Sequence, residues 1–194
     1  MRIIAGIHRG RKLISPTGAG IRPTASKMRT AIFNILSSGS FIKEDGSNAI
    51  ENAKVIDLCC GTGALGIESI SRGAAKVVFI DGSSQHLKIA WENICQLDEQ
   101  TKAIMIRAKA EDLPQARELF DLVFIDPPYF KGIANKALLS LIEKNWLAND
   151  AVIVVELPKQ EDIIFNPEYY REIVTKNYGN SKFILLKRFS VETN

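Results

Sequence analysis

The chain has 194 residues, 46% of them hydrophobic and 24% charged, a composition typical of a globular domain with its own core. This excludes disordered and collagen-like chains, and no apolar run approaches the roughly 20 residues that a membrane helix requires. The net charge is only +3, but residues 1–43 hold eight basic side chains and no acidic one. Such a basic segment before a mildly acidic domain indicates a nucleic-acid partner, or else an ordinary solvated cationic surface.

The sequence shows no export signal at its start and no disulfide framework in its cysteines. Arg9 and Arg11 interrupt the apolar run that an export signal needs. Three cysteines, with Cys59 and Cys60 adjacent, do not form the even set typical of a disulfide framework. Both observations predict a cytoplasmic protein.

Residues 1–43 are predicted to form a small basic extension, followed by a main domain over residues 44–194. Apolar positions interrupted by glycines favour a β-hairpin of two short strands around a basic turn, and then a helix capped by Thr24 or Ser26. The side chains of this extension that we expect to contact nucleic acid are Arg9, Arg11, Lys12 and Arg22.

From Val55 onward, apolar strand patterns alternate with helical patterns, which is typical of a parallel sheet with helices on both faces. Tyr178-Gly179-Asn180 predicts the turn of a closing antiparallel hairpin. The expected strands are Val55–Leu58, Lys76–Ile80, Ala103–Arg107, Asp121–Ile125 and Ala151–Glu156, with Arg171–Asn177 and Ser181–Arg188 as the hairpin. The expected helices are Ala64–Arg72, Ser84–Leu97 and Asn135–Trp146.

A glycine-rich turn follows the first of these strands. Gly61, Gly63 and Gly66 allow the backbone to approach a ligand closely, and the helix behind them presents unpaired N–H groups. This spacing fits a dinucleotide-binding loop, a methyl-donor loop or a tight turn without a ligand. Asp57 favours the methyl donor, because a carboxylate repels a pyrophosphate but attracts the ammonium and sulfonium groups of S-adenosylmethionine.

A second acidic residue, Asp81, ends the next apolar strand, 20 positions after Gly61. At this spacing an acidic side chain can bind the hydroxyl groups of a ribose, which nicotinamide and methyl-donor cofactors both contain. From its position alone, Asp81 could equally be a residue that caps the following helix.

The strongest chemical signal is Asp126-Pro127-Pro128-Tyr129, directly after an apolar strand. The carboxyl ends of the strands form the ligand crevice of an open α/β sheet. Consecutive prolines fix φ and lack N–H donors, which leaves carbonyl groups as acceptors. Asp126 and the Pro127 carbonyl can accept both hydrogens of an exocyclic amine, while the Tyr129 ring stacks on the base. The alternative is a rigid turn with a capping aspartate.

These motifs resemble those of the class I S-adenosylmethionine-dependent methyltransferases. The N-terminal stretches are similar to the RsmD group, bacterial enzymes that methylate the N2 amine of a guanine in 16S ribosomal RNA. The similar stretches are residues 1–13, 21–36, 57–74, 126–129 and 178–181. The resemblance implies a doubly wound, Rossmann-like sheet of seven strands with the last one antiparallel. It also implies S-adenosylmethionine as cofactor, and ribosomal RNA or the small ribosomal subunit as partner.

The resemblance further implies roles for individual residues. It assigns Asp57, Gly61 and Gly63 to the methionine end of the cofactor, Asp81 to its ribose, and Asp126, Pro127 and Tyr129 to the target base. Such enzymes often have an acidic residue beside the adenine after the third strand, where this chain has Lys109. Ala110 and the following Glu111 are therefore the expected adenine contacts.

Three other functions remain open. The glycine spacing alone also fits a nicotinamide-dependent oxidoreductase, and the basic extension fits an RNA-binding protein without catalytic activity. The site motif also fits a methyltransferase acting on adenine N6, or on another exocyclic amine, in DNA or RNA. His8 and His86 have no evident partners for a metal site, so no metal is expected. We expect a monomer without a membrane partner.

Overall fold

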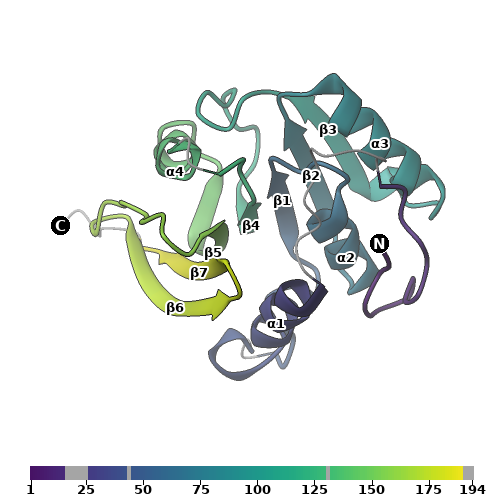
Figure 1. The fold of residues 1–194 in the computed structure, drawn as a ribbon, viewed down its shortest axis with the longest axis horizontal. Coiled ribbons are helices and arrows are strands. Elements are labelled where there is room, and N and C mark those ends of the chain that lie inside the picture. The colour runs from purple at the N-terminus through teal and green to yellow at the C-terminus, as the bar shows by residue number, and fades with distance from the viewer. Residues whose placement is uncertain (16–25, 43–44, 130–131, 190–194) are drawn as a thin grey trace.

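A computed structural model describes residues 1–15, 26–42, 45–129 and 132–189 (Figure 1). Within these residues the chain forms a seven-stranded sheet in the order β3-β2-β1-β4-β5-β7-β6. The first five strands pair in parallel, and β7 runs antiparallel to β5 and β6. The predicted doubly wound α/β fold, with seven strands and an antiparallel last strand, is confirmed.

The expected elements agree with the observed ones within a few residues, with two larger differences. The last parallel strand begins at Leu147 instead of Ala151, and the helix before it ends at Glu143 instead of Trp146. That helix stops because Asn145 takes a φ of +55°, outside the helical range. The strands are β1 (Lys54–Leu58), β2 (Lys76–Asp81), β3 (Ala103–Arg107), β4 (Phe120–Ile125), β5 (Leu147–Pro158), β6 (Tyr170–Tyr178) and β7 (Ser181–Arg188). The helices are α1 (Ser26–Leu36), α2 (Ala64–Ser71), α3 (Ser84–Cys95) and α4 (Ile133–Glu143), and short 3₁₀ turns lie at Gly39–Phe41 and Gln100–Lys102.

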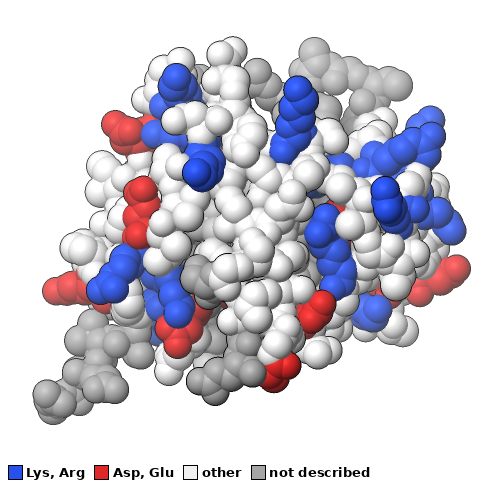
Figure 2. Space-filling model, turned by 90° about the horizontal axis from the view of Figure 1, so that it is seen from below, with Lys and Arg blue, Asp and Glu red and all other residues white. Residues whose placement is uncertain are grey.

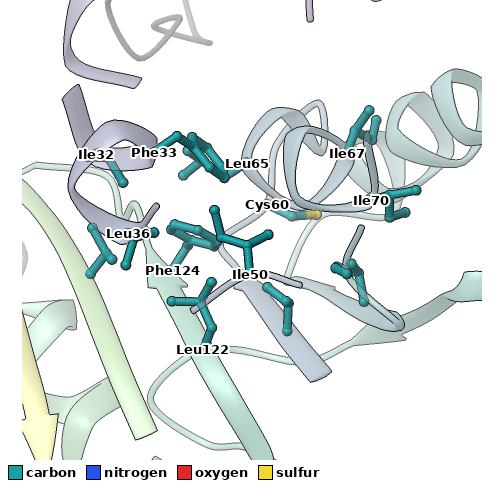
Figure 3. Close-up of a cluster of buried hydrophobic side chains, with 14 of the residues drawn as sticks. Ile32, Phe33, Leu36, Ile50, Cys60, Leu65, Ile67, Ile70, Leu122 and Phe124 are labelled. Carbon is teal, nitrogen blue, oxygen red and sulfur yellow. The ribbon is translucent and has the colours of Figure 1, made fainter. Parts of the chain in front are cut away.

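Helices cover both faces of the sheet, with α1, α2 and α3 on one side and α4 on the other (Figure 1). Alternate strand residues point to opposite faces, so each buried strand contributes to both hydrophobic clusters. On the α1–α3 side, Phe33 of α1 lies close to Leu65 of α2 and Phe124 of β4 (Figure 3). The ring centroids of Phe33 and Phe124 are 5.5 Å apart. None of the helices in the described ranges is long and apolar enough to cross a membrane.

The N-terminal segment, residues 1–15, packs across α2 and α3. The two expected strands are reduced to one antiparallel bridge between Arg2 and Lys12. Regular pairing does not continue because the next backbone N–H groups donate to α2 instead of to a second strand. The side chains of Ile3 and Leu13 are buried in the same hydrophobic cluster as α1, α2 and α3. The segment is therefore fixed against α2 and α3.

A buried carboxylate anchors this segment. Glu68 of α2, only 1% exposed, accepts hydrogen bonds from the N–H groups of Ile4 at 2.8 Å and Ala5 at 3.0 Å. The chain then turns at Gly6, whose φ is +82°. A Cβ at Gly6 would lie 1.7 Å from the carbonyl oxygen of Ser71, so only glycine fits at this contact with α2.

β6 lies at an edge of the sheet, next to β7 and far from the N-terminal segment (Figure 1). Most of its side chains are exposed, including those of Arg171, Glu172 and Lys176. Its pairing with β7 shifts register between Glu172 and Val174.

Candidate active site

The carboxyl ends of β2, β1, β4 and β5 open into one cavity of about 530 Å³. This volume lies in the range of roughly 300–1,000 Å³ that small-molecule sites occupy. Most of the residues predicted from the sequence line it: Asp57, Gly61, Asp81, Ala110, Glu111, Asp126, Pro127 and Tyr129. The glycine loop and the Asp126–Tyr129 motif therefore border a single cavity.

Four neighbouring strands each bring an acidic side chain to this edge of the sheet. These residues are Asp81 on β2, Asp57 on β1, Asp126 directly after β4, and Glu156 on β5. Ile125 pairs with Val155 in parallel register, so the next residues, Asp126 and Glu156, follow side by side on adjacent strands. Adjacent strands lie about 4.8 Å apart, so the cavity contains a row of closely spaced carboxyl groups. Such a row favours cations and hydrogen-bond donors.

The glycine loop is held open towards the cavity at Gly61. This residue has a φ of +54°, and nothing lies within 4 Å of the position that a Cβ would occupy. Its N–H donates to the Asp81 carboxylate at 3.0 Å, and the Ser83 N–H donates to the same carboxylate at 2.8 Å. Asp81 therefore orders the loop and faces the cavity at the same time.

The other two glycines are required by packing. Gly63, predicted as part of the cofactor cradle, is not among the residues that line the cavity. It takes a φ of +77° directly before α2, and a Cβ there would be 3.1 Å from that of Ala90. At Gly66, a Cβ would lie only 2.4 Å from the ring of Phe79. These two glycines let α2 lie close to α3 and β2.

Asp57 lies at the inner end of the cavity and is 1% exposed. Its carboxylate accepts a hydrogen bond from the Gly66 N–H at 2.8 Å. Burial raises the pKa of Asp57 to about 7, the Gly66 N–H opposes that change, and the nearby charge of Asp81 adds to it. A cation in the cavity would favour the ionised form of Asp57.

Cys59 borders the cavity between Asp81 of β2 and Asp126, which follows β4. It takes a φ of +61°, an unusual value for a residue with a side chain. Burial raises the pKa of the Cys59 thiol far above its usual range, and the charges of Asp81 and Asp126 raise it further. The thiol stays neutral, so it is unsuited to act as a nucleophile.

At the other end of the cavity, the hydroxyl of Tyr129 is tethered. It donates to the Glu156 carboxylate at 3.1 Å and lies 2.8 Å from the Ser181 hydroxyl. Burial raises the pKa of Tyr129, so the phenol remains protonated. The Asp126 N–H donates to the Leu58 carbonyl at 3.3 Å, which extends the β1–β4 pairing to the start of the Asp126–Tyr129 motif.

The stretch that contains the predicted adenine contacts lies next to the end of β2, where the Ala108 N–H donates to the Asp81 carbonyl at 3.3 Å. Ala110 is buried and Glu111 is exposed, and both line the cavity together with Lys109. Lys109 forms an antiparallel bridge with Asp112, which holds this stretch in a tight turn.

The predicted nucleic-acid residues lie outside the cavity. Arg9 and Lys12 are exposed on the N-terminal segment, whereas Arg11 donates to the Gln96 carbonyl at 2.8 Å. Arg22 lies outside the described residues. In Figure 2, Lys and Arg side chains lie on both sides of the visible face, with more of them on the right, the side on which the N-terminal segment lies in Figure 1.

Each histidine contacts one carboxylate. His8 Nε2 is 2.7 Å from a Glu99 oxygen, and His86 Nδ1 is 3.2 Å from both oxygens of Asp81. Among the residues that the structure describes, no group of three or more His, Cys, Asp or Glu side chains is placed to hold a metal ion.

The sequence analysis missed several residues of the cavity. Glu156 follows a run of apolar residues, as Asp126 does. The position of an acidic residue after such a run could have identified Glu156 from the sequence. Ser181 and Met1 gave no such signal. Met1 reaches the cavity because its sulfur accepts a hydrogen bond from the buried guanidinium of Arg29.

The strand order, the antiparallel β7 and the ligand cavity at the carboxyl ends define the class I methyltransferase fold. Class I methyltransferases use S-adenosylmethionine, so the fold implies this cofactor. It favours the methyl-donor interpretation of the glycine loop over the nicotinamide one.

The chain belongs to the family described as Conserved hypothetical protein 95, whose model matches residues 1–187. Ribosomal RNA small subunit methyltransferase D of Haemophilus influenzae is 33% identical over 183 residues, covering 92% of this chain and 89% of the relative. An uncharacterized methylase of Rickettsia prowazekii is 32% identical, with 96% and 97% covered. The solved structure of yhhF from Escherichia coli, provisionally named a methyltransferase, has a TM-score of 0.80 at 28% identity and covers 97% of this chain and 98% of its own. The predicted similarity to RsmD-like methylases is thus confirmed at the level of the family.

Proposed function

We propose that this protein transfers a methyl group from S-adenosylmethionine to the exocyclic N2 amine of a guanine in 16S ribosomal RNA. The observation that carries the proposal is that Asp126, Pro127 and Tyr129 share one cavity with the glycine loop. The ribosomal substrate is supported by the relative named for methylation of small-subunit RNA. The proposal is consistent with a cytoplasmic enzyme.

The inner end of the cavity fits S-adenosylmethionine. At Gly61 there is open space where a side chain would stand, so a ligand can approach the backbone closely. Asp57 lines the cavity and can face the cationic methionine end, and Asp81 has the acceptor oxygens that ribose hydroxyls need. Ala110 and Glu111 border the region left for the adenine. When bound, this cofactor supplies an electrophilic methyl group on a sulfonium.

The outer end of the cavity is suited to orient an amine. Guanine N2 is a weak nucleophile because its lone pair is delocalised into the ring. Asp126 and the Pro127 carbonyl accept its two hydrogens, which favours a pyramidal nitrogen with its lone pair directed to the inner end. Such alignment can lower a barrier by about 7–11 kcal/mol. The proton then leaves through Asp126 or water.

Tyr129 contacts the target base, and the basic extension contacts the RNA backbone. The tethered Tyr129 ring provides a stacking surface for a base that has left its helical stack, a step that costs a few kcal/mol. Residues 1–43 supply an excess of positive charge, and Arg9 and Lys12 are exposed for phosphate contacts.

Mass spectrometry of ribosomal RNA nucleosides tests this proposal. Small subunits and free 16S RNA from a strain lacking this gene are incubated with the protein and S-adenosylmethionine, with Asp126→Ala as control. N2-methylguanosine should form with the unaltered protein and fall sharply with the variant. N6-methyladenosine would instead support the adenine alternative, and RNA binding without any methylation would support a non-catalytic protein.

A further inference from the structure

Two carboxyl groups border the place proposed for the target amine. Asp126 and Glu156 follow the paired residues Ile125 and Val155, so they stand on adjacent strands and point to the same face of the sheet. Both line the cavity, and Glu156 is 6% exposed. The sequence analysis gave Glu156 no role, and the proposed transfer of the methyl group does not use it.

The contacts of Tyr129 indicate that the two carboxyl groups border the same part of the cavity. Its hydroxyl donates to Glu156 at 3.1 Å. The charges of Glu156 and Asp126 both raise the pKa of this hydroxyl, as expected if both lie near it. A base stacked on the Tyr129 ring would therefore present its edge to two acidic side chains.

An amine alone does not distinguish guanine from other bases. Adenine, cytosine and guanine all carry an exocyclic NH₂ that Asp126 and the Pro127 carbonyl could hold. The ring nitrogen beside this amine differs, since guanine N1 carries a hydrogen while adenine N1 and cytosine N3 carry a lone pair. An ionised carboxylate only accepts hydrogen bonds. A second carboxylate beside the amine site therefore attracts guanine and repels the other two bases.

We propose that Glu156 is the residue that selects guanine, by accepting the hydrogen on N1 while Asp126 holds the N2 amine. This inference rests on the proposed function, because it concerns the same target base. A carboxylate accepts several hydrogen bonds at once, so the contact with Tyr129 and a contact with N1 are compatible. Ser181, the other partner of the Tyr129 hydroxyl, cannot select in this way because a hydroxyl both donates and accepts.

The test uses 2-aminopurine, which keeps the amine on C2 but has an unprotonated N1. Two RNAs are prepared by ligation, with guanine or 2-aminopurine at the methylated nucleotide, which is located by mass spectrometry of RNase fragments. Single-turnover methyl transfer is measured for each. The unaltered protein should prefer guanine by about 10- to 100-fold, the discrimination that one such paired contact provides. In Glu156→Gln the side-chain amide can donate to N1, so the preference should fall to within about threefold.

Two matched variants separate selection from the positioning of Tyr129. Ser181→Ala removes the other partner of the Tyr129 hydroxyl, and it should keep the preference of the unaltered protein for guanine. Glu156→Ala, a second variant in case the first folds poorly, should also lose the preference. If the Glu156 variants slow both RNAs equally and keep the preference, Glu156 only positions Tyr129 and the inference is wrong. If the unaltered protein does not methylate the guanine RNA at all, the proposed function itself fails.

Discussion

The side-chain amide of Asn93, on α3, donates a hydrogen bond of 3.1 Å to the carbonyl of Thr62, in the middle of the glycine loop. The same side chain accepts from the Ile14 N–H at 2.7 Å and donates to the Ile14 carbonyl at 3.1 Å. Asn93 is fully buried, and Thr62 lines the cavity. One side chain therefore connects the N-terminal segment to the glycine loop that borders the cavity.

Asn93→Ala should weaken both connections. The buried carbonyl of Thr62 and the partly buried backbone groups of Ile14 would lose a partner, so the free energy of unfolding should fall by about 1–3 kcal/mol. Trypsin should cleave sooner after Arg9, and the dissociation constant for S-adenosylmethionine should rise. The matched control is Ser71→Ala, which removes a different anchor of the segment and should affect only trypsin cleavage and stability. Equal cofactor affinity in both variants would contradict the connection.

Asp57 should make cofactor binding depend on pH near neutrality. Because burial raises the pKa of Asp57 to about 7, the folded protein holds this proton more tightly than the unfolded chain does. The free energy of unfolding should therefore fall as pH rises from about 4 to 7, by at most about 1.4 kcal/mol per pH unit from this group. A cationic ligand favours the ionised form, so S-adenosylmethionine should bind more tightly as pH rises through 7.

Asp57→Asn is the matched variant for this prediction. It should lose the contribution of Asp57 to both pH profiles and bind S-adenosylmethionine more weakly above pH 7 while remaining folded. The measurements are urea unfolding and calorimetric titration at several pH values. Identical binding profiles for the variant and the unaltered protein would mean that Asp57 does not face the cofactor.

Alanine substitutions should separate two kinds of glycine in the loop. Gly66→Ala places a Cβ against the Phe79 ring and should lower stability by about 1–3 kcal/mol. Gly61→Ala meets open space but must adopt a positive φ, so it should cost only about 1–2 kcal/mol. It should nevertheless bind S-adenosylmethionine more weakly, because its methyl group enters the space left for the ligand. Thermal unfolding with and without cofactor would show a ligand-induced shift that is reduced for Gly61→Ala.

Removal of Asp126 should lower the rate of transfer more than the binding of RNA. By analogy with donors that stabilise a transition state, Asp126→Ala should lose about 2.7–4 kcal/mol, or roughly 100- to 1,000-fold in single-turnover rate. Asp126→Asn keeps one acceptor oxygen and should lose less. A variant without the carboxylate that transfers methyl groups at the full rate would exclude the proposed amine site.

Tyr129 should contribute through its ring and, to a smaller extent, through its hydroxyl. Tyr129→Ala removes the stacking surface, which should weaken capture of the target base by about 1–3 kcal/mol. Tyr129→Phe keeps the ring but loses contacts with Glu156 and Ser181, at a cost of about 0.5–1.5 kcal/mol. RNA affinity and single-turnover rate, measured separately, should place most of the alanine effect in affinity.

The basic N-terminal segment should give RNA binding its salt dependence. Replacing Arg9 and Lys12 with alanine removes two exposed charges, so the slope of log affinity against log salt should become shallower by about 1–2. Arg11 is left in place because it also contacts Gln96. Lys136→Ala is the control, since Lys136 is exposed on α4 at the opposite face of the sheet. If the double variant and the control have the same slope, the segment is an ordinary solvated surface.

The local patterns in the sequence predicted the sheet and both halves of the cavity, because buried strands are continuous apolar runs and their ends carry distinctive residues. Glu156 was missed because its importance depends on β5 lying beside β4, which no local pattern states. The glycine spacing singled out Gly66, but the sequence did not show why glycine is required there. The reason is that a Cβ would collide with the Phe79 ring on β2. Such features depend on contacts between residues far apart in the sequence.

The exposed edge strand β6 also affects how the protein behaves in concentrated solution. An unpaired strand edge can recruit a second chain, which is a common start of aggregation. Charged side chains at Arg171, Glu172 and Lys176, together with the register shift beside Val174, make β6 a poor template for a further strand. The side of the sheet farthest from the cavity is thereby protected against edge-to-edge growth.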